Sequence, residues 1–183
     1  YSFTKAVIAP DHDPKWDFQG TAFTGVFDGQ GHAITNLPIF GSWSNYPAAV
    51  DNYICLFGKV ENGTIQNVTL ENGYVHGDCW EVWEELEMGW MVVDNGGSSY
   101  VGGLVGYNFQ GTIIACHTSV NVQGAMQIGG LVGVNDGGQI VFSSAAGSVM
   151  CCIPMDQGGN ELGGLVGHNT GTIISCRASN GPV

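Results

Sequence analysis

Few residues of this chain have the types and spacing that chemistry requires. Asp28 and His32 stand four residues apart in FDGQGH, a spacing that could pair an acid with a base. Gly29 and Gly31 both lie between them, and such glycine-rich segments are typical of turns. We therefore interpret the pair as part of a turn. The sequence contains no HExxH, GxSxG or phosphate-loop motif.

An acidic stretch near the start, APDHDPKWD, gathers four candidate metal ligands: Asp11, His12, Asp13 and Asp17. Hard cations need several oxygen ligands presented by a fixed loop, and the spacing of an EF-hand is missing here. We predict a solvated turn at this point and no cofactor for the chain, with calcium left open as a weakly supported ion.

Tryptophans and carboxylates are concentrated in residues 77–99, GDCWEVWEELEMGWMVVDNGGSS. This acidic stretch holds three of the five tryptophans, Trp80, Trp83 and Trp90. If residues 79–88 are helical, the tryptophans fall near one face, and the stretch could fold down over its neighbours. An exposed flap would instead dock a partner or stack on a sugar ring, because aromatic side chains anchor interfaces.

Two other stretches are candidate contact surfaces because they present aromatic or apolar side chains. Residues 39–53 place Trp43 and Tyr46 at a predicted loop tip. The first eight residues, YSFTKAVI, read as an apolar-rich strand that could pair with the open edge of another copy through Tyr1, Phe3 and Val7.

The balance of charge excludes two classes of partner. Sixteen acidic residues face four Lys and Arg residues, which gives a formal net charge of −12. Too few cations remain to neutralise phosphates, so we expect no nucleic-acid partner and no anionic membrane surface. No apolar run reaches the roughly 18 residues of a membrane span. Because the sequence begins at Tyr1 without methionine, we expect a mature or excised product.

The six cysteines and two sequons bear on modification. No CxxC arrangement occurs, and two interpretations stay open: buried free thiols, or a loop disulfide such as one from Cys79 to a neighbour. Asn62 and Asn67 each begin an Asn-x-Thr sequon and are candidate glycosylation sites. Asn62 precedes Gly63 in a predicted turn and is the candidate we expect to be exposed.

One phrase recurs three times along the chain. VGGLVGYNFQGTII starts at Val101, IGGLVGVNDGGQIV at Ile128 and LGGLVGHNTGTIIS at Leu162, with spacings of 27 and 34 residues. A degenerate earlier copy, YICLFGKVENGTIQNVTL, starts at Tyr53. Apolar residues in these copies form short clusters and alternations, which is the pattern of strands.

Stacking one copy on the next would pair each strand with its counterpart, giving parallel sheets without crossover helices. Residues at equal offsets would then form inward ladders of leucine (Leu104, Leu131, Leu165) and isoleucine (Ile113, Ile140, Ile173). A third ladder of asparagines at turns would use Asn108, Asn135 and Asn169, since Asn tolerates left-handed backbone and stacks through its amide. A β-sandwich is the alternative, which the constant offset between the ladders disfavours.

The three phrases resemble the GLUG motif, a repeat named for its Gly-Leu-Val-Gly-like core. FTGVFDGQGHAITNL, from Phe23 to Leu37, is similar to the segment that commonly precedes such repeats. The resemblance implies an all-β, right-handed parallel β-helix in secreted or surface-attached bacterial proteins, adhesins among them, and it carries no catalytic residues. We expect a single solenoid domain over residues 1–183, divided into N-terminal coils (1–52), the degenerate repeat (53–76), the acidic tryptophan-rich loop insertion (77–99) and three repeats (100–126, 127–160, 161–183).

An enzyme is disfavoured on this scaffold. A lyase would need a strong base, and three of the four cations lie outside the repeats: Lys5, Lys15 and Lys59. A glycosidase needs two carboxylates about 5–9 Å apart in a cleft, and the repeats offer only Asp136, Asp156 and Glu161. His117 and His168 occupy unmatched repeat positions, and we interpret them as incidental.

The last residues, RASNGPV, follow a repeat strand with no amphipathic cap, so we expect an open edge covered by another copy or by more of a longer protein. Head-to-tail contact between unlike ends generates filaments. We therefore expect an extracellular structural or adhesive protein, a self-assembling homo-oligomeric fibre subunit. The alternative is a glycan-binding adhesin module of a longer surface protein, using the tryptophan-rich stretch.

Overall fold

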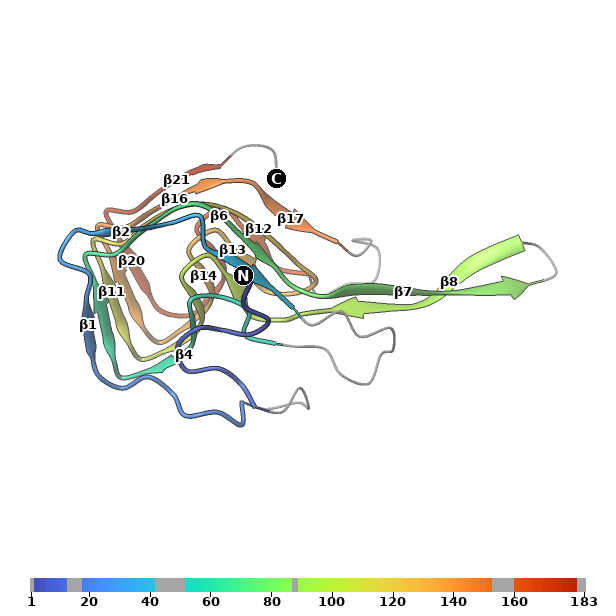
Figure 1. Cartoon of the computed structure of the whole chain (residues 1–183), viewed down its shortest axis with the longest axis horizontal. Helices are drawn as coiled ribbons and strands as arrows, with labels where there is room; N and C mark the ends of the chain where they lie inside the picture. Colours follow the sequence, from blue (N-terminus) through green and yellow to red (C-terminus); the bar gives the residue numbers. More distant parts are fainter. Residues whose placement is uncertain (1, 13–17, 42–51, 87–88, 153–159, 181–183) are drawn as a thin grey trace.

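A computed structural model shows a chain built from short strands that wind into stacked coils (Figure 1). The structure describes residues 2–12, 18–41, 52–86, 89–152 and 160–180, and within 80–96 it describes the backbone alone. No helix occurs among these residues. The parallel, stacked strands form a β-helix-like fold, as the repeats predict.

Five successive coils make up the stack. The first coil holds β1 (Val26–Asp28), β2 (Ala33–Thr35) and β3 (Pro38–Phe40); the second holds β4 (Phe57–Glu61), β5 (Thr64–Gln66) and β6 (Thr69–His76). The third holds β9 (Val101–Gly102), β10 (Val105–Phe109), β11 (Thr112–Ile114) and β12 (His117–Gly124). The fourth holds β13 (Ile128–Gly129), β14 (Val132–Asp136), β15 (Gln139–Val141), β16 (Ser144–Gly147) and β17 (Val149–Cys151). The fifth holds β18 (Leu162–Gly163), β19 (Val166–Asn169), β20 (Thr172–Ile174) and β21 (Arg177–Asn180).

Equivalent strands of successive coils pair in parallel and form the faces of the solenoid. One sheet runs β1-β5-β11-β15-β20, a second β4-β10-β14-β19 and a third β2-β6-β12-β16-β21, while β9, β13 and β18 form a narrow fourth sheet. β3 also pairs with β6, and β17 with β12. The register joins residues one repeat apart, for example Ile113 with Ile140 and Ile140 with Ile173. The fixed register explains why side chains form columns from coil to coil.

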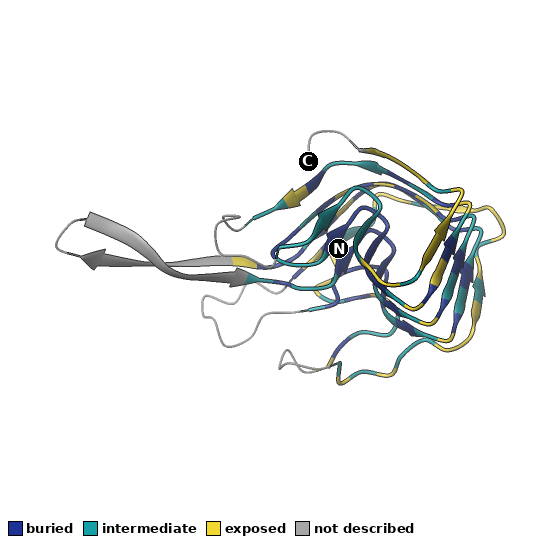
Figure 2. Cartoon of the chain, turned by 180° about the vertical axis from the view of Figure 1, so that it is seen from behind, coloured by how far each residue is buried: buried dark blue, intermediate teal, exposed yellow. Residues whose placement is uncertain are grey.

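The core lies inside the coils and opens toward the last one (Figure 2). Leu104, Leu131, Ile113 and Ile140 are fully buried there, together with Phe57. In the fifth coil Leu165 is only partly buried, and Ile173 is 40% exposed because no further coil covers it among the described residues. The outermost coil therefore leaves apolar side chains of the ladders uncovered.

The glycines of the repeated phrase have a steric role. Gly106 and Gly133 follow paired valines of β10 and β14, so they lie one above the other. A Cβ atom on Gly133 would lie 2.6 Å from the Gly106 carbonyl oxygen, and one on Gly106 would lie 2.8 Å from the Gly58 oxygen. Only glycine fits between coils at this position, which is why the phrase repeats it.

The acidic tryptophan-rich insertion forms an antiparallel hairpin of β7 (Cys79–Leu86) and β8 (Gly89–Gly97), which projects from the coils (Figure 1). The helical conformation considered for residues 79–88 is therefore wrong. A helix of about ten residues is marginal in water, whereas a strand pair rich in valine and tryptophan satisfies its own backbone hydrogen bonds. The projecting position also differs from a segment folded down over coil edges.

A disulfide fixes the base of this hairpin. Cys79 bonds to Cys152, with their Cα atoms 6.0 Å apart. Cys55 and Cys116 are free and buried, and burial raises the pKa of both thiols, that of Cys116 to about 11. These two residues therefore pack as small, protonated side chains. Both sequence interpretations of the cysteines thus apply, each to different residues.

The N-terminal segment lies against the edge of its own chain. Phe3 pairs with Ile39, and the backbone of Ile8 exchanges hydrogen bonds with that of Leu56 and Gly58. Phe3 is 45% exposed, so one side of the segment still faces solvent. Over the part of the chain that the structure describes, no helix is long and apolar enough to cross a membrane.

Candidate binding groove

A groove lies on the outer face of the sheet β4-β10-β14-β19. Two side chains point outward on either side of an inward residue in each coil: Lys59 and Glu61 of β4, Tyr107 and Phe109 of β10, Val134 and Asp136 of β14, then His168 of β19 and Thr170 just after it. Coils about 4.8 Å apart carry these pairs over a span of about 14 Å. The alternation of strands thus presents a row of unlike side chains on one surface.

The inward residues between these pairs hold the strands in register. Asn108 donates from Nδ2 to Asn135 Oδ1 at 2.7 Å, and Asn135 donates in the same way to Asn169 Oδ1 at 2.7 Å. Each amide also donates to a glycine carbonyl of its own coil. The three asparagines form the expected ladder, but they lie in strands and not at left-handed turn positions, which belong instead to residues such as Gln110.

Aromatic rings occupy the N-terminal part of the groove. Tyr53 and Tyr100 stack with centroids 4.7 Å apart and an interplanar angle of 21°, and we call these two residues the tyrosine column. Tyr107 meets both edge-on, at 5.5 Å from Tyr100 and 6.5 Å from Tyr53. Lys59 Nζ lies 5.9 Å from the Tyr107 centroid and 5.5 Å from that of Phe18, within cation–π range.

Asp136 is held by hydrogen bonds from both neighbouring coils. The Tyr107 hydroxyl donates to Asp136 Oδ2 at 2.8 Å, and the Thr170 hydroxyl donates to Oδ1 at 3.0 Å. Burial, followed by the hydrogen bond and negative charge of Asp136, raises the pKa of Tyr107 to about 12. Asp136 is therefore a fixed carboxylate beside a tyrosine that stays protonated.

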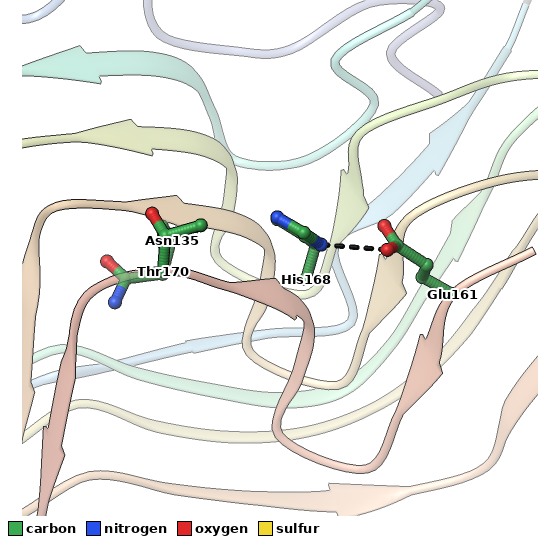
Figure 3. A network of polar contacts seen from close by, with 4 residues as sticks. All are labelled: Asn135, Glu161, His168 and Thr170. Carbon is green, nitrogen blue, oxygen red and sulfur yellow. Dashed lines mark hydrogen bonds and ion pairs between the residues drawn. The ribbon is translucent and has the colours of Figure 1, made fainter. Parts of the chain in front are cut away.

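Glu161 and His168 close the C-terminal end of the groove. His168 Nδ1 lies 2.8 Å from Glu161 Oε1, and both side chains remain partly exposed, at 41% and 39% (Figure 3). Glu161 precedes β18, whereas His168 lies in β19, so the turn between these strands brings them together. Because Nδ1 is engaged, the Nε2 atom of His168 is the ring nitrogen left for a ligand.

The groove contains two adjoining hollows that share Tyr100 and Tyr107. The larger, about 440 Å³, is bounded by Gln127, Val134, Asp136, Glu161, His168 and Thr170, and we call it the C-terminal hollow. The smaller, about 350 Å³, is bounded by Phe18, Tyr53, Lys59, Glu61 and Phe109. Together they offer aromatic surface, hydrogen-bond acceptors and the Lys59 ammonium group, whose Nζ atom lies 3.7 Å from Glu61 Oε2.

The groove offers aromatic faces and hydrogen-bond acceptors, which are the contacts that a polar ring-shaped ligand uses. Among the described residues, no group of three or more His, Cys, Asp or Glu side chains could hold a metal ion. Asp11, from the acidic N-terminal stretch, accepts a hydrogen bond from the Gln19 backbone, and Asp13 and Asp17 lie outside the described residues.

The residues expected to make contacts are dispersed. The backbone of Trp80 and Trp83 lies in β7 and that of Trp90 in β8, while Trp43, Tyr46 and Tyr1 lie outside the described residues. Phe3 and Val7, 45% and 36% exposed, lie on the N-terminal segment. Neither Phe3 nor Val7 is among the residues that border the two hollows.

The remaining candidate residues stand elsewhere on the surface. Asn62 is exposed at a left-handed turn position, whereas Asn67 is partly buried and donates from Nδ2 to Asp28 at 3.0 Å. Hydrogen bonds from Asn67, the Gln30 backbone and Gln66 lower the pKa of Asp28. His32 donates its backbone N–H to the Gly29 carbonyl at 2.8 Å, so FDGQGH leaves β1 after Asp28 and forms a turn, as its glycines indicate.

Sequence reasoning missed the groove because outward residues change from coil to coil. Tyr107, Val134 and His168 occupy one column but share no residue type, so His168 was interpreted as incidental. The sequence does carry a positional signal. Tyrosine stands at the start of the degenerate copy (Tyr53), directly before the first full phrase (Tyr100) and inside that phrase (Tyr107).

Comparison with known proteins identifies one of the coils. Residues 97–123 match the family model of the GLUG motif, a range that covers β9, β10, β11 and nearly all of β12. The resemblance of the repeated phrase to this motif is thereby confirmed. No curated protein and no solved structure matches the chain.

Proposed function

We propose that this GLUG-motif solenoid is a non-enzymatic glycan-binding module of a secreted surface protein, with the outer-face groove as its binding site. The observation that carries the proposal is the combination of the tyrosine column and Tyr107 with fixed carboxylates in one groove across four strands. The C–H faces of a sugar ring pack on aromatic rings, and its hydroxyls donate to carboxylates. The span of about 14 Å fits a short run of sugar residues.

Binding without catalysis agrees with the hydrogen bonding of the carboxylates. Both oxygens of Asp136 already accept hydrogen bonds from hydroxyls, and Glu161 is paired with His168. A glycosidase needs one protonated and one ionised carboxyl group poised on either side of the scissile bond. Asp136, tied to Tyr107 and Thr170, serves better as a fixed acceptor than as a proton donor.

Affinity electrophoresis through gels containing soluble polysaccharides tests the proposal. The chain should be retarded by at least one polysaccharide, and Tyr107→Ala should weaken that retention about tenfold or more through loss of ring contact. Tyr74→Ala is the matched control, because Tyr74 is 56% exposed on a different sheet. Unchanged retention of Tyr107→Ala, with its fold verified by circular dichroism, would contradict the assignment of the groove.

A second candidate function is a structural one, as a stacked fibre subunit. It is favoured by Ile173 and Ile174, which are 40% and 46% exposed on β20 where one more coil would cover them. Because residues 3 and 8 already pair with strands of their own chain, a neighbouring subunit would have to contact the outer side of the N-terminal segment. Electron microscopy of the purified chain distinguishes the candidates: filaments support the fibre, and discrete particles support the module.

The finer features of the fold and setting belong to the same proposal. We take the winding as right-handed, since crossovers between parallel strands are right-handed in nearly all cases. An extracellular location is supported by the Cys79–Cys152 disulfide, because such bonds persist in oxidising compartments. In that setting the projecting tryptophan hairpin would be a second, separate contact surface.

A further inference from the structure

The tyrosine column stops abruptly at the C-terminal hollow. Val101, Ile128 and Leu162 pair in register, so the residues just before them, Tyr100, Gln127 and Glu161, occupy equivalent positions in successive coils. Tyr53 covers one face of the Tyr100 ring. This position therefore changes from aromatic to polar at the point where the groove widens into a space of about 440 Å³.

Tyr100 borders the C-terminal hollow and is only partly buried, so part of its ring is accessible to a ligand there. The three centroid separations, 4.7 Å for Tyr53–Tyr100, 5.5 Å for Tyr100–Tyr107 and 6.5 Å for Tyr53–Tyr107, place Tyr107 beside the stacked pair and not on top of it. A flat ring lying against Tyr100 would thus extend the stack by one member. Tyr107 would then border this ring from the side.

The polar groups around that position are mainly hydrogen-bond acceptors that carry negative charge. Asp136 is fixed by Tyr107 and Thr170, and Glu161 is oriented by His168. A carboxylate has more lone-pair sites than these contacts use, so both can still accept from hydroxyl groups. With a chain charge of −12, the same carboxylates repel an anionic ligand.

We infer that the C-terminal hollow holds one uncharged pyranose ring, stacked on Tyr100, with its hydroxyls donating to Asp136 and Glu161. The groove thereby selects uncharged glycans over glycans that contain uronic acids. This inference rests on the proposed glycan-binding function and names its ligand class. Gln127 and the Nε2 atom of His168 supply the additional polar contacts at the edge of the ring.

The test compares retention by uncharged and anionic polymers in the same affinity gels. The probes are galactomannan, xyloglucan and mixed-linkage β-glucan as uncharged chains, with polygalacturonate and alginate as anionic ones. We expect retardation by an uncharged polymer and none by either polyanion. Glu161→Gln should weaken retention by the uncharged polymer about tenfold, the loss expected for one charge-assisted hydrogen bond, whereas Glu71→Gln, on another sheet, should not.

The possible results separate the inference from the function on which it rests. Stronger retention by polygalacturonate or alginate would overturn the inference and leave glycan binding standing. Wild-type retention of Glu161→Gln by the uncharged polymer would overturn the assignment of the hollow. Absence of retention by all five polymers would overturn the proposed function itself. An unchanged unfolding midpoint of Glu161→Gln shows that any loss is one of binding.

Discussion

Asn135 connects three coils through a single buried amide. It accepts from Asn108, donates to Asn169 and donates to the Gly138 carbonyl at 3.2 Å. Its side chain is fully buried, so each of these groups would have to find another partner if the amide were removed. The ladder is thus a continuous row of side-chain hydrogen bonds that runs from coil to coil. It holds the strands of these coils in register.

Replacing this amide should destabilise the solenoid measurably. Asn135→Ala is expected to lower the free energy of unfolding by about 3 kcal/mol, because it removes hydrogen bonds and leaves buried polar groups unpaired. Asn169→Ala is the matched control at the exposed end of the ladder, with an expected loss of about 1 kcal/mol. Urea unfolding measures both, and equal losses would show that the ladder adds nothing beyond its exposed member.

Tyr107 gives the groove a spectroscopic signature. Its folded pKa of about 12 lies above the ordinary value near 10, so the neutral hydroxyl is favoured in the folded state. The stability that Tyr107 contributes is therefore fully present below pH 10 and is lost as the pH rises through 12. Ultraviolet titration of tyrosinate should show a late ionisation that Tyr107→Phe removes.

Asp136 contributes only part of that shift. Asp136→Asn should lower the pKa of Tyr107 without restoring the ordinary value, because burial is the larger cause and remains. An ionisation of Tyr107 that does not respond to this substitution would contradict the hydrogen bond between them.

At the scale of elements, the sequence predicts those parts of the fold that recur from coil to coil. The coil strands, the parallel pairing and the asparagine ladder follow from residues that recur at equal offsets, since stacking places equal positions together. The hairpin β7–β8 has no counterpart in another described coil, so its conformation depends on its own pairing, and the helix considered for residues 79–88 is wrong over β7. The disulfide partner of Cys79 was equally beyond reach, because Cys152 lies 73 residues away.

The disulfide ties this hairpin to the fourth coil and should stabilise the fold. Reduction, or the double change of Cys79→Ser and Cys152→Ser, is expected to cost about 4 kcal/mol, the loop-closure value for a loop of this length. Cys151→Ser is the control, because Cys151 stands next to Cys152 in the chain and takes no part in this disulfide. A midpoint of urea unfolding that is insensitive to reductant would contradict this role.

At the scale of the whole molecule, residues that repeat from coil to coil and residues that vary occupy opposite faces of the same strands. Inward positions repeat from coil to coil and build the core, while outward positions of the same strands vary and build the groove. The sequence therefore predicts the scaffold from its repeats, whereas Tyr107, Asp136 and His168 gain meaning only when the register places them side by side. The hairpin of β7 and β8 projects from the coils that carry this groove (Figure 1).

Hydroxyl-radical footprinting with a retained polysaccharide tests most directly whether the groove, and not the hairpin, is the ligand surface. Aromatic side chains react readily with the radical, so protection can be read residue by residue from peptide mass spectra. The groove predicts protection of Tyr100 and Tyr107, with Trp80, Trp83 and Trp90 as reactive as in the free chain. Protection of the three tryptophans with both tyrosines unchanged would contradict it and transfer glycan binding to the hairpin.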